Sequence, residues 1–159
     1  LIELIIYISI LSIVLLSMTV FLVSNKKMEG RYKAMTEVEL QGSEIMRIVT
    51  QAIRNAQSVG SPAIGTNGAS ISLVESASAK NPTVFDLAGG KVRMKEGSAS
   101  ATDLNSGQVS VSNLNFKNMS SVNAPGSVRV SFDVSYVNPG HRAESNYSKK
   151  YVDSASIPQ

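Results

Sequence analysis

The chain has 159 residues, which is enough for one domain with an appendage. Its 15 Lys and Arg residues against 12 Asp and Glu residues give a net charge of +3, a mild excess that argues only weakly for nucleic-acid binding. The absence of cysteine excludes disulfides, zinc–thiolate sites and thiol catalysis.

Residues 1–23, LIELIIYISILSIVLLSMTVFLV, are apolar except for a few hydroxyls and the carboxylate of Glu3. A membrane-spanning helix needs about 20 such residues. A secretory signal would instead have an apolar core of about 7–15 residues, a basic start and a small-residue cleavage site, whereas here the polar run SNKK follows. We therefore predict an apolar helix that is retained in the protein.

Four cations follow this segment closely, at Lys26, Lys27, Arg31 and Lys33. The positive-inside rule would place the rest of the chain in the cytoplasm. Because the chain starts without an initiator Met, we expect a leader, and a leader with its own Lys or Arg would reverse that orientation. The residues leave both orientations open.

Helical periodicity continues well beyond the apolar segment, and no proline precedes Pro62. Apolar residues recur in steps of three and four, with Gly42 filling the gap in the series Met28, Tyr32, Met35, Val38, Ile45, Val49, Ala52 and Ala56. We predict one helix over residues 1–57, apolar all round in residues 1–25 and with a single apolar stripe in residues 26–57.

In residues 58–159 the apolar period changes to two, which predicts an antiparallel sheet. A polar loop at 58–69 precedes a short strand at 71–73. The clearest element is a hairpin over residues 83–96, because Gly89-Gly90 suits a two-residue turn. Its register predicts three cross-strand pairs: Leu87 with Val92, Phe85 with Met94 and Asp86 with Arg93.

Three further strands are predicted. Residues 108–117 alternate but change phase at Ser112-Asn113, which indicates a bulge. Residues 127–137 place their apolar side chains, Val128, Val130, Phe132, Val134 and Tyr136, on one face. After a Pro-Gly turn, a last strand is expected over residues 143–152, and residues 153–159 are expected to fray.

One helix stripe and one sheet face must be buried, and each can cover the other. We therefore predict an α+β fold in which a long N-terminal helix packs by its second half on an antiparallel sheet. Its apolar first half projects alone, so the molecule has the shape of a lollipop.

Catalytic motifs are missing from the sequence, which has no nucleophile elbow, Gly-rich phosphate loop or zinc-binding His pair. His141 lies in a polar turn, and Asp103 and Asn105 lack the remaining ligands of a calcium loop. Asn118 and Asn146 match the short and common glycosylation sequon. We expect no enzyme activity, no cofactor and no metal.

Glu3 needs an explanation, because an ionised carboxylate alone at mid-bilayer costs about 2.5–3.5 kcal/mol. It could lie at headgroup depth, or complement the helix N-terminus, which is worth about 0.3–1 kcal/mol. Neither explains why the segment carries a charge at all, and intramembrane carboxylates usually have a partner. Ser9, Ser12 and Ser17 are interpreted as tolerated polar residues, with close helix contacts or a loosened backbone as the alternatives.

The opening LIELI followed by an apolar helix resembles the start of mature type IV pilins and pseudopilins over about the first 20–25 residues. The predicted lollipop fits the fold of that family. The later stretch VSVSNLNFKNMSS is similar, less specifically, to the sheet region of small cysteine-free pilin-like proteins.

The resemblance implies that Glu3 is attracted to the N-terminal amine of a neighbouring subunit as the helices stack into a filament, so that Glu3 and Leu1 form the assembly contact. Filament-core packing would involve Leu4, Ile8, Leu11, Leu15 and Phe21. The resemblance also implies a basic leader, removed by a prepilin peptidase that commonly methylates the new amine.

Three departures from the family pattern stand out. Family members usually carry an aromatic or apolar residue, and often Thr, before Leu-Ile-Glu, whereas this chain begins at Leu1. Many have a helix-disrupting proline where this chain has Val20, and many close a C-terminal loop with a disulfide, for which this chain has no cysteine.

The expected function is that of a structural subunit of a type IV pilus, serving adhesion, twitching motility or DNA uptake. The expected partners are other copies of the chain, the cytoplasmic membrane before assembly, the pilus assembly machinery and the prepilin peptidase. A surface or DNA ligand would meet the loops at 58–69, 97–107 and 118–126 on an extracellular filament. The alternatives are a pseudopilin of a type II secretion-like machine and a signal-anchored envelope binding protein.

Overall fold

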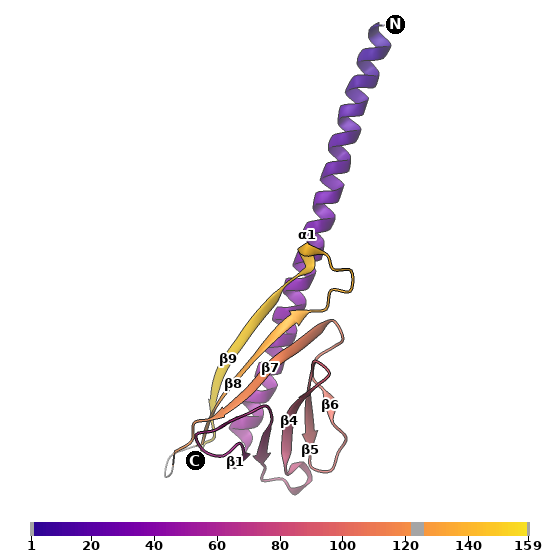
Figure 1. Cartoon of the computed structure of the whole chain (residues 1–159). Coiled ribbons are helices and arrows are strands. Elements are labelled where there is room, and N and C mark those ends of the chain that lie inside the picture. Colours follow the sequence, from indigo (N-terminus) through magenta and orange to yellow (C-terminus); the bar gives the residue numbers. More distant parts are fainter. Residues whose placement is uncertain (1, 122–125, 159) are drawn as a thin grey trace.

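The computed structural model describes residues 2–121 and 126–158. It is an α+β protein in which one long helix, α1 (Ile2–Asn55), packs by its second half against antiparallel sheets while its first half projects alone (Figure 1). The predicted fold is confirmed. Leu1 and residues 122–125 of the predicted loop 118–126 lie outside the described residues.

The helix α1 has 54 residues, which makes it about 80 Å long. Its last turn carries Arg54, which complements the negative end of the helix dipole. The predicted end at residue 57 is two residues too late, because the backbone N–H of Gln57 donates to the carbonyl of Val74 at 2.8 Å instead of continuing the helix.

Five strands form the first sheet, in the order β1-β3-β4-β5-β6. They are β1 (Ser58–Ser61), β3 (Ile71–Val74), β4 (Thr83–Ala88), β5 (Lys91–Glu96) and β6 (Thr102–Asp103). The predicted β4–β5 hairpin is confirmed with all three cross-strand pairs, and Gly89 and Gly90 adopt the positive φ angles, 58° and 75°, that its turn requires.

Four strands form the second sheet, in the order β2-β7-β8-β9. They are β2 (Asn67–Gly68), β7 (Val109–Asn118), β8 (Ser127–Tyr136) and β9 (Ser148–Ser156). The predicted bulge in β7 is confirmed, because the register with β8 shifts between Ser112 and Asn115, and Asn113 has a φ of 54°.

Four details of the predicted head were wrong. One sheet was expected where there are two, and the predicted loops 58–69 and 97–107 contain β1, β2 and β6. Residues 143–145 form a short 3-10 helix, η2 (Ala143–Ser145), so the last strand begins only at Ser148. The expected frayed tail is instead ordered over residues 153–158, because β9 pairs with β8 along its length and both Ala155 and Ile157 are buried, while Gln159 lies outside the described residues.

The core lies between α1 and the two sheets. Val38, Ile45 and Val49 of the predicted stripe are fully buried, and they meet the apolar faces of the sheets, which include Phe85, Phe116, Phe132, Ile71 and Val130. Met28 and Tyr32 belong to the same stripe but are exposed. The head reaches this level of the helix, where Ala34 is buried and Gly30 lies against Ser145, but it covers the opposite side of α1, so periodicity alone placed Met28 and Tyr32 in the core wrongly.

Helix and sheet approach each other closely where Gly42 faces Tyr151 of β9. A Cβ atom on Gly42 would overlap the Tyr151 ring, so glycine is what lets the ring lie against the helix backbone. The same ring stacks on Phe132 with centroids 5.5 Å apart, and its hydroxyl donates to the carbonyl of Val38 at 3.0 Å. Nearby, Lys149 Nζ donates to Glu39 Oε1 at 3.1 Å.

We expect Gly42→Ala to lower the free energy of unfolding by about 1–2 kcal/mol, because overpacking against a rigid ring outweighs the gain in helix propensity. Denaturant unfolding of the full chain in mild detergent measures it. The matched control is Gly30→Ala, also in the helix, whose new Cβ would lie 3.3 Å from Ser145 Oγ and should change stability less. A Gly42→Ala protein as stable as the wild type would contradict the close approach.

Alkaline pH should loosen the same contact. Burial raises the pKa of the Tyr151 phenol above its ordinary value of 10.0, and the hydrogen bond to Glu39 raises the pKa of Lys149. The folded state therefore holds both protons more tightly than the unfolded state, so this stability is complete below about pH 10 and is lost as pH rises further.

Unfolding free energies measured between pH 8 and 11 should fall at the alkaline end, and Tyr151→Phe should make that fall shallower. The matched control is Tyr32→Phe, which removes an exposed phenol outside the contact. If the two variants show the same alkaline slope, Tyr151 is not the group responsible.

Candidate functional site

The most unusual surface of the molecule is the projecting part of α1, residues 2–23, which we call the stem. All 17 of its large apolar side chains are between 50% and 77% exposed. By length and composition, α1 is long and apolar enough to cross a membrane, and none of that segment is buried in the fold. A continuous apolar surface of this size requires either lipid or other protein to cover it.

Four of the predicted packing residues share one face of the stem. Leu4, Ile8, Leu11 and Leu15 are spaced by four, three and four residues, which aligns them along a helix with 3.6 residues per turn. The same spacing continues through Met18 and Leu22, which the predicted packing set does not include.

The fifth predicted packing residue, Phe21, does not join this row. It lies 18 residues after Glu3, which is five helical turns, so Phe21 shares its face with Glu3. All five predicted residues are exposed in the single chain, so each is free to contact lipid or another helix.

Glu3 lies in the first turn of α1, where a carboxylate complements the positive end of the helix dipole. Within residues 2–121 and 126–158 it forms no ion pair. The predicted contact partner, Leu1, falls outside the described residues.

The hydroxyl groups of the stem are satisfied within the helix. Ser9, Ser12 and Ser17 each donate to the carbonyl four residues earlier, at 2.8, 2.7 and 2.9 Å, and Thr19 does the same at 2.9 Å. A hydroxyl bonded in this way can enter an apolar environment without losing its donor partner. The stem is therefore nearly as apolar in effect as an all-aliphatic helix.

Polar residues that suggested chemistry in the head have structural roles. Asn105 is buried and accepts from the N–H of Val92, while its amide donates to the carbonyls of Gly90 and Val109. Asn118, from one sequon, is buried with its amide donating to the carbonyl of Pro62 at 2.8 Å, so glycan attachment there is blocked. Among the residues that the structure describes, no three potential metal ligands lie together.

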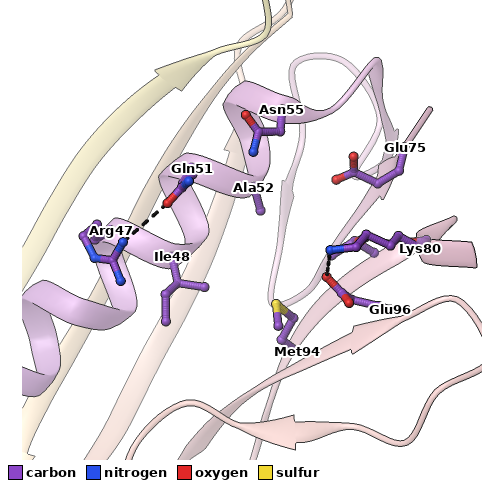
Figure 2. A pocket seen from close by; sticks show the side chains of 10 residues that line it. Arg47, Ile48, Gln51, Ala52, Asn55, Glu75, Lys80, Met94 and Glu96 are labelled. Carbon is purple, nitrogen blue, oxygen red and sulfur yellow. Dashed lines mark hydrogen bonds and ion pairs between the residues drawn. The ribbon is translucent and has the colours of Figure 1, made fainter. Parts of the chain in front are cut away.

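A cleft of about 280 Å³ lies between the end of α1 and the five-stranded sheet. Ile48, Ala52 and Met94 are in its wall (Figure 2). Three of its four charged side chains have partners, since Lys80 Nζ lies 3.1 Å from Glu96 Oε1 and Arg47 binds Gln51 and Glu44, while the fourth, Glu75, forms no ion pair within the described residues. The cleft has no unpaired buried polar group that would select a ligand.

Comparison of the chain with protein-family models, with curated proteins and with solved structures found no match.

Replacing Ser9, Ser12 and Ser17 together by Ala should leave insertion and self-association of the stem nearly unchanged, because their hydroxyls are bonded inside the helix. Reconstitution of the full chain, with energy transfer between labelled copies, measures self-association. A weakening of about 0.6 kcal/mol or more per serine, the average for hydrogen bonds between membrane helices, would show that these hydroxyls bind a neighbouring helix instead.

Proposed function

We propose that this chain is a filament subunit of the type IV pilus kind, assembled by packing of its stems. The observation that carries the proposal is the continuity of α1, which runs as one helix from the exposed stem into the core of the head. No linker separates the two parts, so an arrangement of stems also fixes the arrangement of heads. A simple membrane anchor has no need of such stiff coupling.

The stem supplies the driving force. In the membrane its side chains are covered by lipid, and in a filament they would be covered by the stems of other copies, with the row Leu4, Ile8, Leu11 and Leu15 as the first contact. Because both environments are apolar, transfer between them exposes little new surface to water. One segment therefore suits both a membrane-held precursor and an assembled core.

Glu3 would supply specificity to this packing. An unpaired carboxylate in an apolar core costs about 2.5–3.5 kcal/mol, so stems that slide out of register are penalised. A neighbouring N-terminal amine removes the penalty at one axial offset. A single buried polar residue sets register in coiled coils by the same mechanism.

The head would then face outward on the filament, where its loops are available to a surface or DNA ligand. The precursor would require a prepilin peptidase and an assembly machine. The resemblance of the N-terminal segment and the stiffness of α1 support this proposal, and a secretion pseudopilus would use the same subunit architecture in a shorter fibre.

Glu3→Gln should reduce filament protein in sheared surface material by about tenfold or more, since each 1.4 kcal/mol of lost contact energy is a factor of ten. The amount of subunit in the membrane fraction should stay unchanged. Immunoblots of both fractions, with electron microscopy of the fibres, measure this in cells that produce the complete gene product.

The matched control is Glu29→Gln, which removes the same charge from the exposed part of α1 just beyond the stem. It should assemble normally. Normal fibres from Glu3→Gln would overturn the register role, and an absence of fibres from the wild type would favour a simple anchored protein.

A further inference from the structure

The net charge of this protein is concentrated in ten residues. Residues 24–33, SNKKMEGRYK, hold four of the 15 Lys and Arg residues and one of the 12 acidic residues, so the rest of the chain carries eleven of each and is neutral. The four cations, Lys26, Lys27, Arg31 and Lys33, are called the basic arc below. They follow directly after the stem.

The charges of the basic arc are not compensated within the fold. All four side chains are exposed, and none forms an ion pair with a residue in the described ranges 2–121 and 126–158. Elsewhere in the same ranges, five Lys or Arg residues do form ion pairs. The arc is therefore a free cationic surface on an otherwise balanced molecule.

The basic arc lies on the side of α1 that faces the head. At about 100° per residue, its four members spread over roughly 160° of the helix, centred near Gly30 and Ala34. Ala34 is fully buried, and Gly30 lies against Ser145 in the connection between β8 and β9. Met28 and Tyr32 point to the opposite side. The cations thus lie around the stem end of the contact between head and helix, where Gly30 meets Ser145.

The stem places this surface at a defined depth. Its 22 described residues extend about 33 Å, close to the hydrocarbon thickness of about 30 Å. The headgroup region on each side adds roughly 5–8 Å, which matches the first turns after Val23. With the stem in a bilayer, Lys26 and Lys27 lie among the headgroups and the rest of the arc lies at their outer edge.

A shallow groove connects the stem to the basic arc. It has a volume of about 300 Å³ and is lined by Thr19, Val20, Val23, Ser24 and Lys27. The hydroxyl of Thr19 donates to the carbonyl of Leu15, so the lining is mostly apolar up to Lys27. An apolar groove that ends at an ammonium group fits a phospholipid, with an acyl chain along the groove and a phosphate at the lysine.

We propose that the basic arc and this groove bind anionic phospholipid on the side of the bilayer where the head lies. Bound lipid neutralises the arc and holds the base of the head against the membrane surface. The proposal goes beyond filament formation and does not depend on it, because it concerns the single subunit in the membrane.

The test is lipid selectivity of the full chain in bilayers of phosphatidylcholine with 30% phosphatidylglycerol. Spin-labelled forms of both lipids report, by electron paramagnetic resonance, the fraction that is immobilised at the protein. We expect about a two- to threefold preference for phosphatidylglycerol. Salt at 1 M should abolish this preference, because it reduces the Debye length to about 3 Å and so screens the charges.

Three variants decide the cause of the preference. Lys26→Gln, Lys27→Gln and Arg31→Gln together should remove it, while the charge-conserving set Lys26→Arg, Lys27→Arg and Arg31→Lys should keep it. The matched control, Lys95→Gln, Lys117→Gln and Arg129→Gln, removes the same charge from exposed sites on the sheets and should also keep it.

Equal immobilisation of both lipids by the wild type would overturn the proposal. So would an equal loss of preference in the control set, because the preference would then come from net charge rather than from the arc. Loss in the charge-conserving set would also contradict it. None of these outcomes depends on fibres, so failure here is distinct from failure of the filament proposal.

Discussion

The contact between Gly42 and Tyr151 is the constraint on which the rest of the molecule depends. It joins the first element of the chain to the last, since α1 begins at Ile2 and β9 ends at Ser156. The tyrosine contributes in three ways, by stacking on Phe132, by donating to the carbonyl of Val38 and by filling the space that glycine leaves. The angle at which the stem leaves the head follows from this packing.

Polar groups find their hydrogen-bond partners in different places in the stem and in the head. In the stem, hydroxyls bond back to their own helix and leave Glu3 as the only ionisable carboxylate in an apolar setting. In the head, buried amides such as Asn105 and Asn118 join neighbouring loops and strands. Asn105 and Asn118, which suggested chemistry in the sequence, therefore stabilise the fold. The surfaces suited to binding are the apolar stem and the basic arc next to it.

Strong local patterns made much of this fold predictable. The β4–β5 hairpin followed from its Gly-Gly turn and three agreeing pairs, and the bulge in β7 followed from a change of phase. The division into two sheets did not, because β2 and β6 have two residues each and depend on distant partners. The burial of Ile157 was missed for the same reason, since its N–H donates to the carbonyl of Gly126. The stem itself was evident from hydropathy, but the side of α1 that the head covers near Met28 and Tyr32 was not.

The distance along the chain between α1 and β9 has a consequence for biosynthesis. The stem is synthesised before the head, whereas Ile45 and Val49 gain their full cover only when residues 148–157 have been synthesised. Until then, the apolar stripe on the second half of α1 is not covered by the sheet, and the head cannot complete its folding. The stem is therefore complete before the head can fold, and a chain truncated before β9 keeps an exposed apolar stripe that makes it prone to aggregation.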